Sequence, residues 1–339
     1  MLRISTISFP GLGIGEFDIN SVAFELFGRP VAWYGLIITI GMICAVIYTV
    51  VQAKKIGVTF DDIIDYALFT IPIGVIGARL YYVIFDNENT YETLYDVFNI
   101  AGGGLAIYGG IIAGTLTVLC VSLVKKISFF AFGDSVAPAV LLAQGIGRWG
   151  NFANGEAFGS QTDWFCRMGL KNVVSYHTFG TTQTVYVHPT FLYESIWNLI
   201  GVLGVYLFAK KIGKKYDGQL ILLTFGWYGF GRFFIEGLRS DSLYIGETGI
   251  RVSQGLAALV FLVLSGLLIY FAIKPPKRPL YCKEFPIQND VTEVKSEIKT
   301  EGKPDSLVEF KKAVKSFFKP KYEMDTSNST KKKNYKKKK

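Results

Sequence analysis

The stretch AWYGLIITIGMICAVIYTVVQA, residues 32–53, contains no charged side chain and is long enough to cross a lipid bilayer. About 20 consecutive apolar residues span the hydrocarbon core as a helix, in which every backbone hydrogen bond is internal. Six similar runs follow, at residues 63–86, 104–124, 128–149, 191–209, 219–237 and 252–273. Half of the residues are hydrophobic and the mean hydropathy is +0.32, which excludes an ordinary soluble globular protein. We predict an all-α polytopic integral membrane protein with about seven transmembrane helices.

Basic side chains stand at alternate ends of these runs, at residues 54–55, 125–126 and 210–215. Short cytoplasmic loops are enriched in Lys and Arg, so these ends are predicted to face the cytoplasm. The loop at 86–96 has four acidic residues and no basic one, which favours the opposite face. The N-terminus is therefore expected outside and the C-terminus inside. Residues 1–31 lack the pattern of a signal peptide, so no N-terminal processing is expected.

The charge of the chain is concentrated in its last part. Residues 274–339 carry a net charge of +10, whereas the rest carries −1. Such a polar, basic, juxtamembrane segment is typical of a disordered tail that is attracted to anionic membrane lipids, and this interpretation is favoured over nucleic-acid binding. We expect a transmembrane catalytic domain at 1–275, with a small extracytoplasmic head at 150–190, and a cytoplasmic tail at 276–339.

Ionisable side chains inside the predicted spans gather near their outer ends. Each costs about 2.5–3.5 kcal/mol on the insertion scale and therefore needs an interior or aqueous role. In the run 219–237 and just beyond it, Tyr228, Arg232, Glu236 and Arg239 follow at helical spacing and share one face. Arg232 and Glu236 could simply neutralise each other. Arg148 and Arg239 would still leave excess positive charge, and forked guanidinium donors suit a phosphate such as a phospholipid headgroup.

Two further segments allow both structural and functional interpretations. The glycines of GIGRWGNFANGEAFG (145–159) permit close backbone approach at the mouth of a site, or plain helix packing followed by a loop. His188 could be catalytic or a satisfied structural group. The glycine-rich run 101–114 lacks the setting of a nucleotide-binding loop and is predicted to pack helices. The four cysteines form no disulfide framework or zinc pattern.

The motif GRWGNFANGEAFG (147–159) resembles the signature of prolipoprotein diacylglyceryl transferases, approximately G-R-x-G-N-F-x-N-G-E-x-x-G. Five other segments resemble the family's remaining motifs in the same order: AWYGL (32–36), GARLYYV (77–83), GGLAIYGG (103–110), HPTFLYES (188–195) and YGFGRFFIEGLRSDSL (228–243). The resemblance covers roughly residues 20–275 and leaves out the basic tail.

The resemblance implies a multi-pass enzyme of the bacterial cytoplasmic membrane that needs no cofactor or metal. Such an enzyme moves the diacylglyceryl group of phosphatidylglycerol to the lipobox cysteine in the signal peptide of a prolipoprotein and releases glycerol-1-phosphate. By motif position, Arg148 and Arg232 would hold the donor phosphate, with His188 and Tyr108 as further candidate catalytic residues. The implied substrate-binding positions are Tyr34, Arg79, Asn151, Glu156, Gly159, Tyr228, Glu236 and Arg239.

Tyr108 departs from the family pattern, because some members have His at that position. A phenol with an ordinary pKa near 10 is a weaker base at neutral pH than imidazole, with about 6.5. The thiol of the acceptor, with an ordinary pKa of about 8.5, needs a base or a positive potential, and His188, Tyr108 and the arginines remain open as candidates. A transporter and a lipid-binding scaffold are the competing classes. The outward position of the charges and the absence of repeated halves disfavour a transporter.

Overall fold

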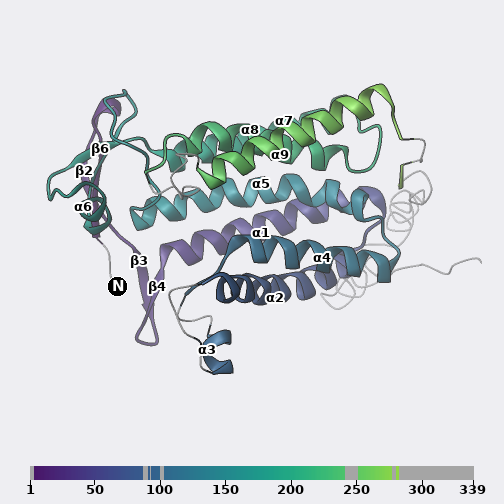
Figure 1. Cartoon of the computed structure of the whole chain (residues 1–339), viewed down its shortest axis with the longest axis horizontal. Helices are drawn as coiled ribbons and strands as arrows, with labels where there is room; N and C mark the ends of the chain where they lie inside the picture. Colours follow the sequence, from purple (N-terminus) through teal and green to yellow (C-terminus); the bar gives the residue numbers. More distant parts are fainter. Residues whose placement is uncertain are drawn as a thin grey trace, which may run out of the picture. The chain divides into compact units, whose positions relative to one another are not determined.

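A computed structural model of the chain describes residues 4–86, 91, 93–99, 103–240, 251–276 and 280–281. They belong to one compact unit, Met1–Ile287. Each of the seven apolar runs forms a helix in this unit (Figure 1). These helices are α1 (Trp33–Ala53), α2 (Phe60–Phe85), α4 (Ile107–Lys125), α5 (Phe129–Asn154), α7 (Thr190–Lys211), α8 (Gln219–Glu236) and α9 (Val252–Ile273).

Six helices of the described residues are long and apolar enough to cross a membrane, and together they identify a multi-pass membrane protein. The helix outside this set is α8. It is 18 residues long and carries Arg232 and Glu236 within its apolar sequence. It packs against α5, α7 and α9, so neighbouring helices shelter its polar face. The prediction of a helical membrane bundle is confirmed, while the number and direction of crossings remain a prediction.

Local sequence signals explain where the helices begin and end. Thr59 and Asp62 form a reciprocal capping box at the start of α2, and the Ser128 side chain accepts a hydrogen bond from the backbone N–H of Ala131 at the start of α5. Such caps satisfy backbone donors that have no partner inside the helix. Gly155 ends α5 in the left-handed conformation with φ 59°, which glycine adopts without steric penalty.

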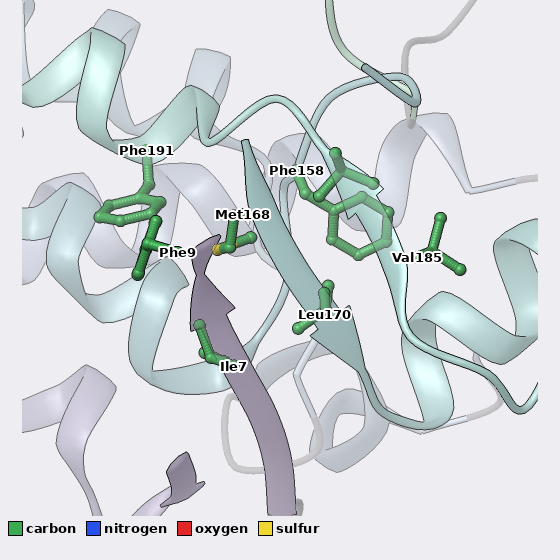
Figure 2. Close-up of a cluster of buried hydrophobic side chains, with 8 residues drawn as sticks. Ile7, Phe9, Phe158, Met168, Leu170, Val185 and Phe191 are labelled. Atoms are coloured by element: carbon green, nitrogen blue, oxygen red, sulfur yellow. The ribbon is translucent and has the colours of Figure 1, made fainter. Parts of the chain in front are cut away.

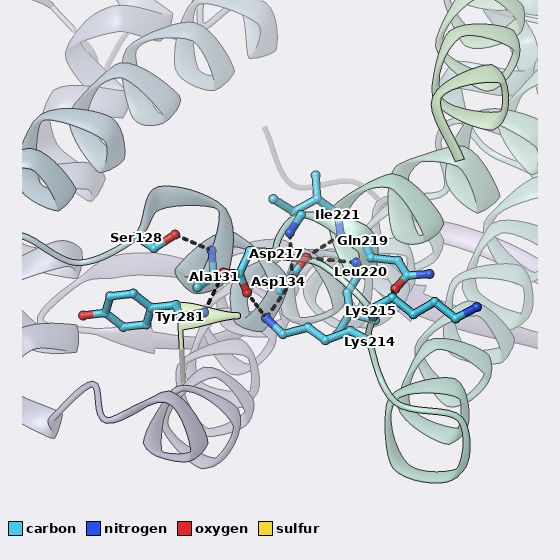
Figure 3. A network of polar contacts seen from close by, with 11 residues as sticks. Ser128, Ala131, Asp134, Lys214, Lys215, Asp217, Gln219, Leu220, Ile221 and Tyr281 are labelled. Carbon is cyan, nitrogen blue, oxygen red and sulfur yellow. Dashed lines mark hydrogen bonds and ion pairs between the residues drawn. The ribbon is translucent and has the colours of Figure 1, made fainter. Parts of the chain in front are cut away.

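The helix ends next to Lys54–Lys55, Lys125–Lys126 and Lys210–Lys211 lie at one pole of the bundle, which we call the lysine end. Ion pairs connect neighbouring helices there. Lys125 at the end of α4 contacts Asp62 at 2.7 Å and Asp65 at 2.6 Å, both in the first turns of α2. On α5, the carboxylate of Asp134 accepts from the backbone N–H groups of Gly218, Leu220 and Ile221 and so caps α8 (Figure 3). Lys214 pairs with the same carboxylate at 3.0 Å, which compensates its burial.

Small residues allow α2 and α4 to pack closely. A Cβ added at Gly109 would collide with the backbone of Gly77 and the side chain of Tyr81. The two helices therefore approach each other at glycine, as predicted for the glycine-rich run 101–114. Residues 101–102 of that run lie outside the described residues.

Between α7 and α8, Trp197 and Trp227 stack with ring centroids 4.1 Å apart. Each indole N–H donates to the other tryptophan's backbone carbonyl, at 3.0 and 2.9 Å. Because the two bonds are reciprocal, they fix the register of these two helices.

A small head at the opposite pole, the head end, contains β-strands that the helical prediction did not include. The strands β1 (Ile4–Phe9), β2 (Ile14–Asn20), β5 (Met168–Lys171) and β6 (Val185–Val187) form an antiparallel sheet in the order β2-β1-β5-β6. The central pairing places Ile7 opposite Leu170. One face buries a hydrophobic cluster that also takes in Phe158 and Phe191 (Figure 2).

The N-terminal residues thus form part of this head, together with the segment 150–190. The remaining elements are the 3-10 turns Pro10–Leu12 and Lys54–Ile56, the short helices α3 (Leu94–Phe98) and α6 (Val173–Phe179), and a hairpin of β3 (Val22–Leu26) and β4 (Arg29–Ala32).

Candidate active site

Three arginines from the α5 and α8 segments converge on one carboxylate of α7 near the head end. Arg148 Nη2 lies 2.5 Å from Glu194 Oε2, and Arg232 Nη1 lies 2.6 Å from Glu194 Oε1. Arg239 Nη1 is 3.5 Å from the same Oε1 atom. Arg232 also contacts Glu236, four residues later on α8, with Nη2 at 2.5 Å from Oε2. The predicted pairing of Arg232 with Glu236 is therefore present, but within a larger cluster.

The glutamate side chains of this cluster are buried, and the arginine side chains are partly accessible. The Glu194 and Glu236 side chains are each 3% exposed, compared with 20% for Arg148, 15% for Arg232 and 12% for Arg239. Three guanidinium groups and two carboxylates give this set a formal charge of +1. Because the two carboxylates are more deeply buried than the three arginines, the cluster presents mainly positive charge to an incoming group.

Contacts between α5 and α7 hold the cluster in register. The Trp149 indole donates to Ser195 Oγ at 3.1 Å, and Ser195 Oγ donates to the carbonyl of Gly145 at 2.8 Å. Trp149 and Ser195 directly follow Arg148 and Glu194 in sequence, so the bonds fix the helix turns from which the two charged side chains project. Tyr34 of α1 packs on the same turn, because a Cβ added at Gly150 would lie 2.9 Å from its ring.

The turn after α5 gathers several motif residues. Glu156 accepts from the side-chain amides of Asn151 at 3.3 Å and Asn154 at 3.2 Å. Thr190 at the start of α7 donates its hydroxyl to the carbonyl of Ala157 at 2.5 Å. Asn151 and Glu156 therefore shape the corner that joins α5 to α7.

Gly159 is required by a close backbone approach. Its N–H donates to the carbonyl of His188 at 2.9 Å, and it forms a β-bridge with Arg239. A Cβ at this position would lie 2.7 Å from the Cβ of His188 and 2.8 Å from the carbonyl oxygen of Leu238. The glycine thus lets the segments before α7 and after α8 meet, which brings Arg239 to the cluster.

His188, two residues before the start of α7, belongs to a short polar chain. Its Nδ1 atom lies 3.2 Å from the hydroxyl of Tyr193, and this hydroxyl lies 3.2 Å from Cys166 Sγ. Burial lowers the pKa of His188 below its ordinary value, so the neutral imidazole prevails at pH 7. A neutral imidazole can accept a proton, and the role of a base remains a prediction for His188.

Two predicted site residues have other surroundings. Arg79 is buried, and its guanidinium donates to four backbone carbonyls. These are the carbonyls of Asp96, Val97, Gly103 and Gly104, at 2.7–3.1 Å. Arg79 therefore holds the segment between α2 and α4, and its contact with substrate remains a prediction.

Tyr108 is the second residue of α4, and its ring centroid lies 6.5 Å from that of Tyr81. Tyr228 lies one helical turn before Arg232 on α8. A catalytic role for Tyr108 remains a prediction.

Glu194 is the site residue that the sequence analysis did not select. A carboxylate in an apolar run is a signal in its own right, since an ionisable residue inside a span needs a partner. The partners were not visible, because Arg148 precedes Glu194 by 46 residues and Arg232 follows it by 38.

The arrangement of motif residues around the cluster agrees with the similarity of the chain to known proteins. Residues 21–270 match the family model described as prolipoprotein diacylglyceryl transferase. The chain belongs to this family. All six motif segments of the sequence analysis fall within the matched residues, which confirms the resemblance stated there.

Individual relatives agree with this assignment. The chain is 42% identical to the phosphatidylglycerol–prolipoprotein diacylglyceryl transferase of Enterococcus faecalis, over 79% of this chain and 95% of the relative. It is also 42% identical to proteins of that name from Clostridium perfringens, over 73% and 96% of the two chains, and from Clostridioides difficile, over 71% and 91%. The similarity therefore extends over nearly the whole length of each relative.

Proposed function

We propose that this family member transfers the diacylglyceryl group of phosphatidylglycerol to the lipobox cysteine of a prolipoprotein, at the outer face of the bacterial cytoplasmic membrane. The names of its relatives give the donor and the acceptor class. The observation that supports the chemistry is the cluster of Arg148, Arg232 and Arg239 around Glu194. It offers partly exposed arginine side chains near the head end of the helical bundle, the level at which we expect a lipid headgroup.

The charges of the donor and the cluster are complementary. Phosphatidylglycerol carries one negative charge on its phosphodiester, and the five charged side chains of the cluster sum to +1. Arg148 uses one terminal nitrogen on Glu194, whereas Arg232 uses one on Glu194 and the other on Glu236; a guanidinium has five N–H donors. In this proposal Arg148 offers its other terminal nitrogen in a forked contact with phosphate oxygens, and Arg232 adds the N–H groups that do not face the two carboxylates.

In the proposed reaction, the sulfur of the acceptor cysteine attacks the glyceryl carbon that bears the phosphate. A carbon–sulfur bond forms, and the bond between that carbon and the phosphate oxygen breaks with its electron pair going to oxygen. Glycerol-1-phosphate leaves with one more negative charge than the diester had, and the thiol proton passes to a base. Arg148 and Arg232 stabilise the charge that develops on the phosphate. His188 and Tyr108 remain the candidates for the base.

Glu194 acts in this proposal as a positioning residue. A flexible arginine side chain loses conformational entropy when it is fixed, and this loss opposes productive binding. Because Glu194 holds two guanidinium groups before the substrate arrives, part of that ordering is already complete. The carboxylate is buried, so it orients the arginines without itself facing the phosphate.

The remaining assignments follow from this function. Tyr34, Asn151, Glu156, Gly159, Tyr228, Glu236 and Arg239 would shape the site, and Arg79 would hold the segment beside it. Residues 1–275 form the catalytic part with the head outside, and residues 276–339 form a cytoplasmic tail that contacts membrane lipids.

An assay with purified protein separates the proposed transferase from a lipid-binding scaffold and a transporter. Phosphatidylglycerol labelled in its acyl chains is supplied in liposomes with a lipobox peptide, and a peptide with Cys→Ser serves as control. We expect the label to appear on the cysteine peptide together with one equivalent of glycerol-1-phosphate. Binding of labelled lipid without product would instead identify a scaffold, and release of intact lipid or peptide into the opposite compartment would identify a transporter.

A further inference from the structure

The turn of the β3–β4 hairpin contains a phenylalanine in a backbone conformation that glycine or asparagine usually adopts. Its two central residues, Phe27 and Gly28, have φ of 51° and 72°. Positive φ at both central residues is the pattern of a type I′ turn, in which Asn-Gly and Asp-Gly are preferred because a side chain with Cβ resists this conformation. A bulky aromatic residue in the left-handed region is uncommon, so its presence needs a compensating contact.

The turn also exposes its apolar side chains. Phe27 is 96% exposed, Leu26 52% and Phe24 47%. Residues of both strands are exposed or half-buried throughout, and the two strands pair only with each other in the described residues. An isolated two-stranded hairpin is marginally stable in water. The exposed apolar side chains therefore point to an apolar environment around the tip.

The position of the hairpin indicates which environment this is. Strand β4 ends at Ala32, and α1 begins at Trp33, so the hairpin continues directly into a membrane span. Trp33 and Tyr34, both exposed, mark the interfacial level at which such side chains concentrate. Figure 1 shows the hairpin extending across the direction of the helix axes beside the start of α1. The hairpin therefore lies at the depth of the lipid headgroups.

We propose that the β3–β4 hairpin is a membrane-surface anchor, whose tip inserts Leu26 and Phe27 into the headgroup–acyl boundary of the leaflet at the head end. Arg29 follows the tip directly, opposite Leu26 in the hairpin, and its guanidinium can meet a headgroup phosphate. The partner is the lipid surface itself. The proposal goes beyond the transferase function and does not depend on it.

Tryptophan fluorescence in proteoliposomes tests this anchor with the full chain. The variants Phe27→Trp and Leu26→Trp add one indole to the five native tryptophans, and the emission of the unchanged protein is subtracted. Tyr176→Trp is the matched control, since Tyr176 is a 48% exposed aromatic residue on α6 in the head. In Figure 1 this helix lies farther from the helical bundle than the hairpin.

We expect lipids brominated in the acyl chains to quench the added emission at positions 26 and 27 several-fold more than that at position 176, and aqueous acrylamide to quench in the reverse order. Equal acrylamide quenching at all three positions, with no effect of brominated lipid, would overturn the anchor. If the indole at position 27 were protected from acrylamide only at a high protein-to-lipid ratio, the partner of the hairpin would be a second copy of the chain. That result would also overturn the membrane anchor.

Discussion

At the scale of single residues, Glu194 organises the candidate site because it contacts guanidinium groups from two other helices. Glu194→Gln keeps the shape of the side chain but removes the charge that orients Arg148 and Arg232. We expect kcat to fall by about a hundredfold, the effect of a small misplacement of catalytic groups. KM for phosphatidylglycerol should not rise, because the cluster becomes more positive. Steady-state kinetics in liposomes measures both constants.

Glu16→Gln serves as the control for this variant, since Glu16 is an exposed residue of the head sheet. A Glu194→Gln enzyme with kcat within about threefold of the unchanged protein would contradict the positioning role.

Arg148→Lys and Arg232→Lys test the forked contact with phosphate. Lysine keeps one positive charge but lacks the planar pair of donors, so turnover should fall by about a hundred- to thousandfold, or about 2.7–4 kcal/mol in the barrier. Arg167→Lys is the matched control, because Arg167 contacts the carbonyl of Asp163 and the ring of Tyr186 on the head. If both site variants were folded and turned over at near-normal rates, the phosphate contact would have to be abandoned.

At the scale of elements, the α2–α4 pair depends on a glycine contact. Gly109→Ala would place a methyl group against the backbone of Gly77, so the helices must separate and the start of α4, with Tyr108, must shift. Overpacking of this kind destabilises by about 1–3 kcal/mol. We expect a lower melting temperature in detergent together with lower transferase activity.

Gly204→Ala on α7 provides the comparison, because a Cβ there would meet no other part of the described structure within 4 Å. Alanine also favours a helix over glycine by about 1 kcal/mol. Similar melting temperatures for the two alanine variants would show that the α2–α4 contact is looser than the structure indicates.

At the scale of the whole molecule, the predicted orientation places the head outside the cell and the lysine end inside. Position 90, a natural site for a topology label, lies outside the described residues. Thr182 in the head and Lys211 at the end of α7 are exposed alternatives. In intact cells, a membrane-impermeant thiol reagent should label Thr182→Cys and not Lys211→Cys, after subtraction of the signal from the native cysteines. The reverse pattern would invert the topology.

The basic tail should be dispensable for the chemistry, since it is predicted on the opposite face from the site. Deletion of residues 284–339 keeps Tyr281, whose backbone N–H donates to Asp217 at 2.9 Å beside the Asp134 network. We expect transferase activity in liposomes to match that of the full chain, with weaker binding to anionic vesicles lacking any substrate. Loss of turnover at equal protein abundance would refute this division of the chain.

The sequence by itself determined the features that depend on local chemistry. The apolar runs place the seven long helices within a few residues, because a span is defined by its own hydrophobic length. Caps such as Thr59 and Ser128 act within one helical turn, and the i,i+4 spacing of Arg232 and Glu236 predicts their contact. The motif around Arg148 indicated the family that the comparisons then confirmed.

Only the tertiary structure decided the contacts between distant segments. Residues 4–9 pair with residues 168–171 in the head sheet, and short strands of this kind are stabilised by their partners rather than by their own sequence. In the same way, Glu194 becomes the centre of the cluster only when α5, α7 and α8 are packed in register. A short stretch of sequence cannot predict which strands pair or which ion pair is buried. Both depend on which distant segments pack against each other and so exclude water and lipid.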